Sequence, residues 1–302
     1  MNILVFGASG NIGASLVERL GALGHSVRAF VRRDISSNSL RERGIRVFRG
    51  DLGDSEAIKP ALEGAEAIIN ASYIVYAGNI LKAASDSGAR PKRIIYIGST
   101  GIYTRLPSRS ASDKRSAEEL IRNSSVPYTV LRPTMVYGTA KDRNIFRLIS
   151  FLHRYPLFPV FGKGENLTQP VYIDDVAGAV IASLNTPTAV NKSYDIGGRC
   201  ALTHNELIDV TARKLGRKVV KVHLPMSLSV WLARAARSAA GKFPISEEQI
   251  LRLNENKDVD ISAAAKDFGY KPLSFPEGVE REIELFLKTR KTADQNRRDK
   301  TR

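Results

Sequence analysis

Short apolar runs alternate with amphipathic stretches through the first half of the chain. An apolar run over residues 3–6 opens the sequence, and an amphipathic stretch then continues to about residue 23. The same pattern predicts further strands at 26–31, 46–49, 67–70, 93–98 and 128–132, with helical segments such as 55–62 and 116–123 between them. Strands that alternate with helices in this way predict a parallel, doubly wound α/β sheet, which binds ligands at the carboxyl ends of its strands.

A glycine-rich turn, Gly7-Ala8-Ser9-Gly10-Asn11-Ile12-Gly13, follows the first strand directly. Gly7 allows a sharp turn out of the strand, Gly10 leaves room for a phosphate, and Gly13 lets the next helix pack close to the sheet. Backbone N–H groups at the start of such a helix can bind the pyrophosphate of a dinucleotide. An ordinary turn between strand and helix is the alternative, but the position between these two elements favours a Rossmann-type dinucleotide site.

Four later motifs occur in a recognisable order. They are an Arg-Pro-x-x-Val-Tyr-Gly element at 132–138, a strand-to-helix segment at 171–177, a strand at 193–198 and a C-terminal pattern at 261–278. Together with glycines spaced three apart at the N-terminus, they resemble the extended short-chain dehydrogenase/reductase superfamily. Within it, the closest resemblance is to the NAD-dependent epimerase/dehydratase family, which includes nucleoside-diphosphate-sugar epimerases.

The resemblance covers roughly residues 1–288 and implies a two-part architecture. We expect a Rossmann-type doubly wound parallel sheet with a smaller C-terminal α+β substrate domain. The expected NAD(P)-binding domain comprises residues 1–138 and 168–198, and the expected substrate domain comprises residues 139–167 and 199–288. Residues 289–302 are basic, polar and almost without apolar side chains, so they predict a disordered tail.

The residues that follow the second strand bear on the choice of cofactor. Arg32 and Arg33 stand where an NAD-binding relative places an acidic residue, and two guanidinium groups could bind a 2′-phosphate. We therefore predict NADP, with NAD and a merely solvated basic turn as alternatives. By resemblance, Asp51 contacts adenine and Pro133 borders the nicotinamide. The predicted cofactor residues are Gly7, Ser9, Gly10, Asn11, Ile12, Gly13, Arg32, Arg33, Asp51, Leu52, Asn70, Ala71, Ser72, Lys114 and Pro133.

The predicted catalytic residues are Ser99, Ser110 and Lys114. By resemblance, Ser99 is the hydroxyl that binds a substrate carbonyl or alcohol. The family carries Tyr-x-x-x-Lys on the next helix, with the tyrosine as acid/base, and here Lys114 is present but the tyrosine position is Ser110. General acid–base catalysis typically supplies about 10²–10⁴-fold in rate, so turnover should be slow unless another group substitutes. Tyr103 and Tyr73 are candidates for that substitute, although no motif places either.

The resemblance also implies a substrate, either a nucleoside-diphosphate sugar or a related carbonyl or alcohol. The predicted substrate-binding residues are Thr100, Tyr103, Arg143, Asn144 and Lys163. A charged surface loop is the alternative interpretation for the basic and amide residues among them. The four histidines lack the spacing of metal ligands, so we predict no metal.

Composition narrows the range of partners. The formal net charge of +15 is compatible with anionic small molecules or an anionic membrane, but no aromatic platform or motif of a nucleic-acid-binding protein accompanies it. The basic tail and a helix over 225–240, with apolar Leu228, Trp231, Leu232, Ala235 and Ala236, could make peripheral membrane contact. Packing of that helix on its own domain is the main alternative. An oligomer is compatible with the sequence.

Localisation is predicted from what the sequence lacks. No apolar run approaches the roughly 20 residues that cross a bilayer, and the first strand begins at residue 2, so we expect a cytoplasmic protein. The single cysteine, Cys200, cannot form an internal disulfide, which agrees with a reducing compartment. We expect Cys200 to be a small buried hydrophobic residue.

Two functions follow from these patterns. The first is an NAD(P)-dependent oxidoreductase, epimerase or dehydratase, favoured by Ser99, Lys114 and the substrate-domain motifs. The second is an NADP-binding protein of weak or no activity that acts as a redox sensor or assembly subunit, favoured by the missing tyrosine.

Overall fold

The computed structural model describes residues 1–32, 38–227 and 251–299. Its regular elements are, in chain order, β1 (Asn2–Phe6), α1 (Asn11–Ala22), β2 (Ser26–Val31), α2 (Asn38–Arg41), β3 (Arg46–Arg49), α3 (Ser55–Leu62), β4 (Ala67–Asn70), η2 (Ile74–Tyr76), α4 (Ala77–Asp86), β5 (Arg93–Ile97), η3 (Thr100–Tyr103), α5 (Arg109–Arg122), β6 (Tyr128–Pro133), β7 (Val136–Tyr137), α6 (Ile145–Arg154), β8 (Leu157–Phe161), β9 (Leu167–Thr168), β10 (Val171–Tyr172), α7 (Ile173–Asn185), η4 (Pro187–Ala189), β11 (Lys192–Ile196), β12 (Leu202–Thr203), α8 (His204–Lys214), β13 (Val220–Leu224), α11 (Ser262–Phe268) and α12 (Phe275–Asp299). None of the helices in these ranges is long and apolar enough to cross a bilayer.

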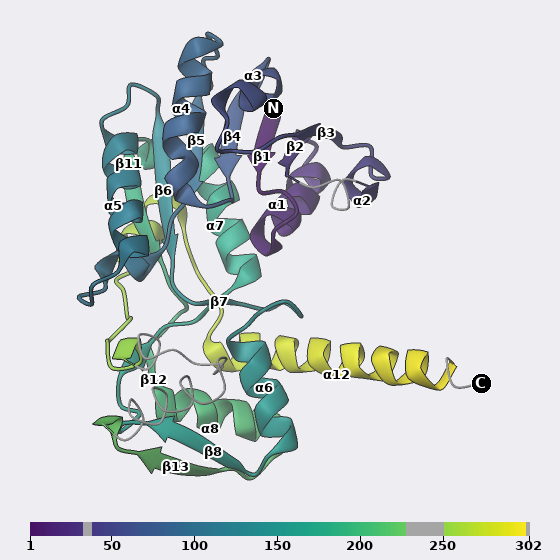
Figure 1. Ribbon diagram of the computed structural model, residues 1–302, viewed down its shortest axis with the longest axis vertical. Coiled ribbons are helices and arrows are strands. Elements are labelled where there is room, and N and C mark those ends of the chain that lie inside the picture. Colours follow the sequence, from purple (N-terminus) through teal and green to yellow (C-terminus); the bar gives the residue numbers. More distant parts are fainter. Residues whose placement is uncertain (33–37, 228–250, 300–302) are drawn as a thin grey trace, which may run out of the picture.

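A seven-stranded sheet forms the larger part of the fold, with the strand order β11-β6-β5-β4-β1-β2-β3 (Figure 1). All its pairings are parallel. The chain builds β2 and β3 on one side of β1 and then crosses to β4 on the other side. The order in which strands are added to the sheet therefore reverses between β1 and β4. Doubly wound folds bind their ligands at this switch point. The predicted doubly wound α/β sheet is confirmed.

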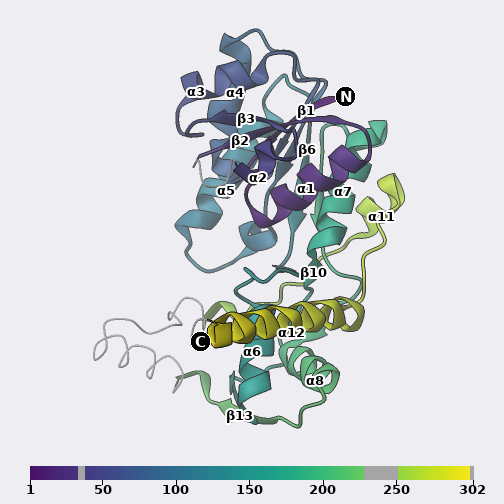
Figure 2. The same cartoon turned by 90° about the vertical axis from the view of Figure 1, so that its right-hand side faces the viewer.

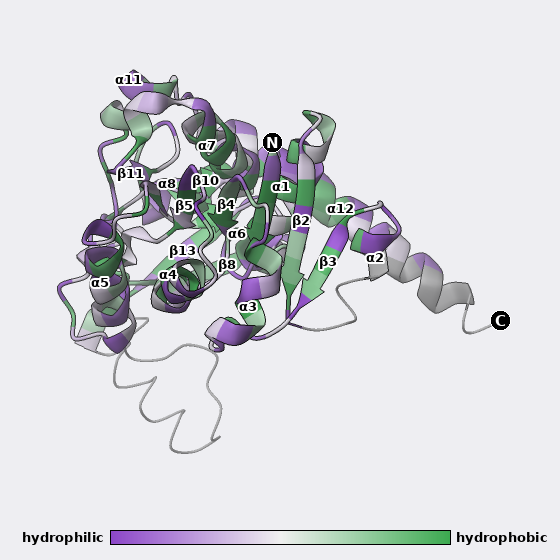
Figure 3. Cartoon of the chain, turned by 90° about the horizontal axis from the view of Figure 1, so that it is seen from above, coloured by the Kyte–Doolittle hydropathy of each residue, from purple (hydrophilic) through white to green (hydrophobic). Residues whose placement is uncertain are grey.

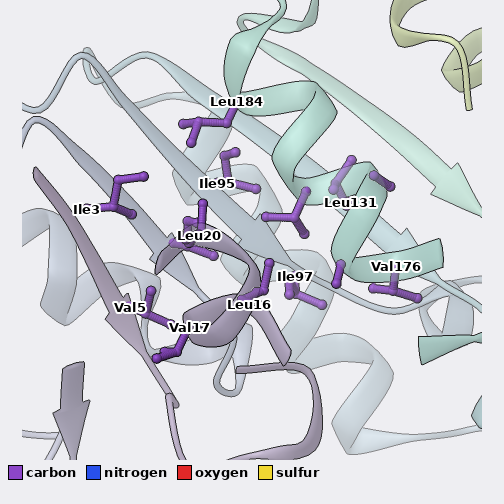
Figure 4. Close-up of a cluster of buried hydrophobic side chains, with 14 of the residues drawn as sticks. Ile3, Val5, Leu16, Val17, Leu20, Ile95, Ile97, Leu131, Val176 and Leu184 are labelled. Atoms are coloured by element: carbon purple, nitrogen blue, oxygen red, sulfur yellow. The ribbon is translucent and has the colours of Figure 1, made fainter. Parts of the chain in front are cut away.

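Helices cover both faces of this sheet, so its central strands β1, β4 and β5 are buried on both sides. One face packs against α1, α7 and α11 through side chains such as Leu16, Val176 and Leu131, several of which Figure 4 labels. The other packs against α3, α4 and α5 through side chains that include Ile80 and Ile121. Burial on both faces explains why these strands read as continuous apolar runs in the sequence. Figure 3 shows largely hydrophobic residues along strands such as β2 and β4, and helices such as α5 in which hydrophobic and hydrophilic residues alternate.

A second, smaller core lies beyond the carboxyl ends of the strands (Figure 2). It joins α6, α8 and the first half of α12 with β8 and β13, which pair in parallel. Its buried side chains include Leu152, Leu207 and Val279. The N-terminus of α8 carries a capping box in which the Thr203 hydroxyl and the Glu206 carboxylate each bind the other residue's backbone N–H.

The C-terminal segment differs from the expectation. Helix α12 continues to Asp299, through most of the segment for which the sequence predicts disorder, and Figure 1 shows it projecting from the body of the molecule. Side chains at 287–292 are exposed, so this part makes little apolar contact. Its Lys, Arg and Ala residues are good helix formers, which explains how the helix can extend without a core of its own.

Two further expectations concern loops. Cys200 is exposed rather than buried, because it lies in the connection between β11 and β12 and not in a strand or helix that faces a core. That expectation was wrong. The apolar helix expected over 225–240 falls almost wholly outside the described residues, including Leu228, Trp231, Leu232, Ala235 and Ala236.

Candidate functional site

The glycine turn has the close backbone contacts that its sequence predicts. Gly7 has φ +73°, and a Cβ atom there would lie 2.9 Å from the carbonyl oxygen of Ala71 in the loop after β4. A Cβ atom on Gly13 would lie 2.1 Å from the Gly7 oxygen. Both positions therefore exclude any side chain: Gly7 by its left-handed backbone and its contact with the loop after β4, and Gly13 by the packing of α1 against the turn.

The N-terminus of α1 is open to a ligand. Gly10 is its N-cap residue, so no side chain caps the helix, and the first turn carries no acidic residue. Asn11, Ile12 and Ala71 line a cavity of about 190 Å³ at this point. Uncapped N–H groups and the positive end of the helix dipole favour an anion, and a glycine at the cap leaves space for it to approach. These residues fit the pyrophosphate of a dinucleotide; Ser9 lies beside them and is exposed.

The residues after β2, β3 and β4 lie at the same edge of the sheet. Arg32 is exposed at the end of β2, and Arg33 lies outside the described residues. The Asp51 carboxylate accepts the backbone N–H of Gly53 at 2.7 Å, which stabilises the turn that contains Leu52. This side chain is exposed.

Asn70 is completely buried at the end of β4. Its Oδ1 accepts the backbone N–H of Ser72 at 3.1 Å and the Ser72 hydroxyl at 2.5 Å. No described residue accepts a hydrogen bond from its Nδ2. Asn70 therefore stabilises the conformation of the Ala71–Ser72 loop that packs against Gly7.

Three side chains converge on Gly101 in η3, just after β5. Ser99 caps this short helix, and its Oγ accepts the Gly101 N–H at 3.1 Å. A Cβ atom on Gly101 would lie 3.2 Å from Ser99 Oγ, 3.6 Å from an Arg252 guanidinium nitrogen and 3.7 Å from Lys114 Nζ. Burial and the charge of Arg252 lower the pKa of Lys114. Pro133, at the end of β6, accepts a hydrogen bond from Thr100 at 3.4 Å. A hydroxyl and two cations thus surround one point at the carboxyl edge of the sheet.

Tyr103 is held by charged groups. Its hydroxyl donates to Asp195, 2.9 Å from Oδ2, and accepts from Arg132 Nη1 at 2.9 Å. Arg132 also binds Glu118, with 2.6 Å between Nη2 and Oε2. Partial burial raises the pKa of Tyr103 to about 12; Arg132 acts in the opposite direction and Asp195 adds to the rise. Its proton is therefore bound firmly by Asp195 near neutral pH.

Tyr73 makes different contacts. Its hydroxyl lies 3.2 Å from Ser110 Oγ, and Lys114 Nζ lies 5.8 Å from the centroid of its ring. A phenol from the loop after β4 therefore reaches the first turn of α5, on which Ser110 and Lys114 are one helical turn apart.

A cavity of about 710 Å³ lies next to Gly101. Residues of 100–106, residues of 251–259 and Asn166 line it. Arg252 and Lys257 are among them, and burial followed by the charge of Arg252 lowers the pKa of Lys257. Glu255 anchors the two walls to each other, since its carboxylate accepts the Thr104 hydroxyl at 2.7 Å and the Arg105 N–H at 2.8 Å. The cavity is therefore lined by cationic and amide side chains, and it borders Gly101, which Ser99 and Lys114 approach.

Comparison with known proteins places this geometry in a family. Residues 1–266 match the NmrA-like family. The chain belongs to the NmrA-like family. It is 28% identical over 295 residues to the Arabidopsis thaliana mitochondrial protein named NADH dehydrogenase [ubiquinone] 1 alpha subcomplex subunit 9, covering 88% of this chain and 71% of that relative. It is 26% identical over 235 residues to a ceramide reductase from Caulobacter vibrioides, covering 74% of this chain and 73% of that relative.

The fold of this NmrA-like protein also matches a solved enzyme structure. UDP-glucuronic acid 4-epimerase from Bacillus cereus in complex with NAD superposes with a TM-score of 0.74 at 20% identity, covering 95% of this chain and 96% of that one. The predicted resemblance to the extended short-chain dehydrogenase/reductase superfamily is confirmed. The NmrA-like protein therefore shares the fold of this epimerase.

The predicted substrate residues do not all lie together. Thr100 and Tyr103 line the 710 Å³ cavity. Lys163 lines a separate cavity of about 690 Å³, which shares Asn254 with the first. Arg143 and Asn144 are exposed before α6 and follow Asp142, which lines the small cavity at the glycine turn. In the described ranges, no group of three or more His, Cys, Asp or Glu side chains is arranged to hold a metal.

Sequence reasoning missed the second wall of the main cavity. Arg252, Glu255 and Lys257 follow the part of the chain least similar to any motif, and they reach the site only through the packing of the C-terminal segment. The run Asn254-Glu255-Asn256-Lys257-Asp258 was a usable signal, because a stretch of consecutive polar residues is typical of a loop, and loops often carry binding residues.

Proposed function

We propose that this NmrA-like protein is an NADP-dependent oxidoreductase that acts on a carbonyl or alcohol group. The convergence of Ser99, Lys114 and Arg252 around Gly101, at the mouth of a 710 Å³ cavity, is the observation that supports this most strongly. Such a site brings a hydrogen-bond donor and positive charge to one side of a carbonyl oxygen. Both stabilise the negative charge that develops on that oxygen during reduction.

The cofactor would span the carboxyl edge of the sheet. The start of α1 would bind its pyrophosphate, Arg32 the 2′-phosphate of NADP, and Lys114 the ribose next to the nicotinamide. When bound, the reduced nicotinamide supplies the hydride. The chain's own part is to orient the carbonyl: Ser99 Oγ already accepts the Gly101 N–H, and no described residue accepts the hydrogen of its hydroxyl, which is therefore available to the substrate.

A nucleoside-diphosphate sugar is the substrate class that we propose. The cavity presents the cations Arg252 and Lys257, which suit a diphosphate, and the amides of Asn166, Asn254 and Asn256, which suit sugar hydroxyls. Glu255 is already occupied by hydrogen bonds to the opposite wall, so it opposes an anionic substrate less than an unbound carboxylate would.

The test is NADPH oxidation by the full chain with a panel of 4-keto nucleotide sugars and simple ketones. Wild type should bind NADPH and oxidise it with at least one member, and Lys114→Met should weaken NADPH binding. Lys218→Met removes an exposed cation that does not line the cavity, and it should leave NADPH binding and NADPH oxidation unchanged. No oxidation with any member, despite NADPH binding, would contradict the oxidoreductase proposal.

An NADP-binding subunit or redox sensor is the second candidate. Two observations favour it: Ser110 stands where the resemblance expects the catalytic tyrosine, and the Arabidopsis relative is named as a subunit of NADH dehydrogenase. NADPH binding without turnover, together with retention of the protein in a larger complex, would support this candidate.

A further inference from the structure

Two hydroxyl groups from separate parts of the chain meet beside Lys114. Tyr73 follows β4 and Ser110 lies in the first turn of α5, yet their oxygens are 3.2 Å apart, a distance at which either can donate to the other. Both residues are exposed, and the relative exposure of Tyr73 is 41%. The pair therefore connects the site to solvent through two groups that can each give and accept a proton.

Lys114 links this pair to the point where a carbonyl would be polarised. Its Nζ lies 5.8 Å from the centre of the Tyr73 ring, and also 3.7 Å from the Cβ position of Gly101, next to Ser99. A cation in this position favours the negative charge that develops on a phenol oxygen as its proton leaves. The same ammonium group thus faces both the proton donor and the carbonyl site.

The Tyr103 and Thr100 hydroxyls at this edge are engaged elsewhere. The Tyr103 hydroxyl donates to Asp195 while Arg132 donates to it, and its pKa, raised to about 12, makes it a weaker acid. The Thr100 hydroxyl donates to the Pro133 carbonyl. The Tyr73 hydroxyl, by contrast, pairs with the exposed hydroxyl of Ser110, which can exchange its proton with water.

We propose that Tyr73 and Ser110 form a two-hydroxyl proton relay, with Tyr73 as the general acid and Ser110 as its route to solvent. The inference rests on the proposed oxidoreductase function. In the reduction, the carbonyl carbon gains a hydride from NADPH, the C=O electron pair moves to oxygen, and the Tyr73 O–H bond breaks as its proton joins that oxygen. The carbonyl becomes an alcohol, NADPH becomes NADP⁺, and Ser110 passes a proton from water back to the phenolate.

Kinetics of four variants test the relay, using the substrate that the panel identifies. Tyr73→Phe should lower kcat by about 10²-fold or more, the usual contribution of general acid catalysis, with NADPH affinity unchanged within about twofold. Ser110→Ala should lower kcat less. Tyr76→Phe, which removes a neighbouring phenol from the short helix that Tyr73 precedes, should have no effect. Tyr73→Phe combined with Ser110→Tyr should regain activity, because the new phenol starts from the helix position that Tyr73 now reaches.

A second measurement needs neither cofactor nor substrate. In protein labelled with ¹³C at tyrosine Cζ, the Tyr73 resonance should shift in Ser110→Ala, which removes its hydrogen-bond partner. It should stay in place in Ser112→Ala, an exposed serine on the same helix. If the chemical shift of Tyr73 is the same in wild type and in Ser110→Ala, the hydrogen bond between Tyr73 and Ser110 does not form in solution.

The outcomes separate this inference from the proposed function. If wild type turns over and Tyr73→Phe retains full kcat, the relay is wrong while the oxidoreductase stands. If Tyr73→Phe lowers NADPH affinity as much as it lowers kcat, Tyr73 positions the cofactor and is not the acid. If wild type turns over nothing, the proposed function fails, and the general-acid role of Tyr73 fails with it, even where the resonance confirms the contact.

Discussion

Arg132 and Glu118 form a buried ion pair, with 2.6 Å between Nη2 and Oε2 and two further contacts of 3.0 Å from Nε. The pair joins the end of β6 to α5, the helix that carries Ser110 and Lys114. Glu118 is only 4% exposed, so its removal would leave the charge of Arg132 buried without its main partner. The position of α5 thus depends on this pair.

We therefore predict that Glu118→Ala lowers the free energy of unfolding by about 3–5 kcal/mol, the usual cost of breaking a buried pair from one side. Urea denaturation measures it. Glu119→Ala is the matched control, because Glu119 is the exposed neighbour on the same helix, and it should change stability by less than about 0.5 kcal/mol. Equal changes in the free energy of unfolding in the two variants would show that the Arg132–Glu118 pair does not stabilise the fold.

Two glycines of α1 should respond in opposite directions to the same substitution. Gly13→Ala places a Cβ atom 2.1 Å from the Gly7 oxygen and should destabilise the protein by about 1–3 kcal/mol. At Gly21 the same atom meets nothing within 4 Å, so Gly21→Ala should stabilise by about 0.5–1 kcal/mol through the helix propensity of alanine. Thermal unfolding of both variants tests the packing of the glycine turn, and a stable Gly13→Ala would refute it.

Arg32 should determine the preference between the two cofactors. Arg32→Ala should weaken NADPH binding by about 1.5–3 kcal/mol, the value of a hydrogen bond to a charged group, and leave NADH binding nearly unchanged. Arg90→Ala removes the same charge before β5, at the opposite end of the strands, and should affect neither cofactor. Calorimetric titrations would decide, and equal affinity of wild type for NADPH and NADH would count against an NADP site.

Glu282 should make stability depend on pH. It is fully buried on α12, neither carboxylate oxygen has a hydrogen bond of good geometry within the described chain, and its neighbours include Asp142, Tyr137 and the backbone N–H groups of Gly138 and Thr139. Burial, reinforced by Asp142, raises the pKa of Glu282 to about 8 from its ordinary value of 4.5.

The folded state therefore keeps a proton that the unfolded chain releases between these two values. Folding should lose on the order of 3 kcal/mol as the pH rises from about 5 to 8. Glu282→Gln should remove most of this loss, and urea denaturation at pH 6 and pH 8 checks it. A wild type of the same stability at both values would mean that Glu282 is ionised in the folded protein.

Much of the fold was predictable because its signals are local. The strand at Arg93–Ile97 and the helix at Ser55–Leu62 lie where the apolar pattern indicates, since a strand that is buried along its whole length is largely apolar. The close approach of Gly7 and Gly13 likewise follows from their spacing alone. Cys200 shows the limit of such reasoning, because hydrophobicity does not reveal whether a residue lies in a loop.

The contacts of the candidate site depend on packing between distant segments. Tyr73 and Ser110 are 37 residues apart, and Thr104 and Glu255 are 151 apart, with no shared motif to connect either pair. The sequence could name Tyr73 and Tyr103 as candidate acids, but only their hydrogen-bond partners distinguish a phenol beside a serine from one held between Asp195 and Arg132.

A crystal structure of the protein with NADPH tests the central claim most directly. The account predicts the pyrophosphate at the N-terminus of α1 beside Gly10, and the nicotinamide near Pro133 with its reactive carbon facing the space between Ser99 and Tyr73. Reacting atoms in such a site should lie about 3–3.5 Å apart once a substrate is present. A nicotinamide that turns away from Ser99 and Lys114, or an NADPH bound elsewhere on the molecule, would contradict the account.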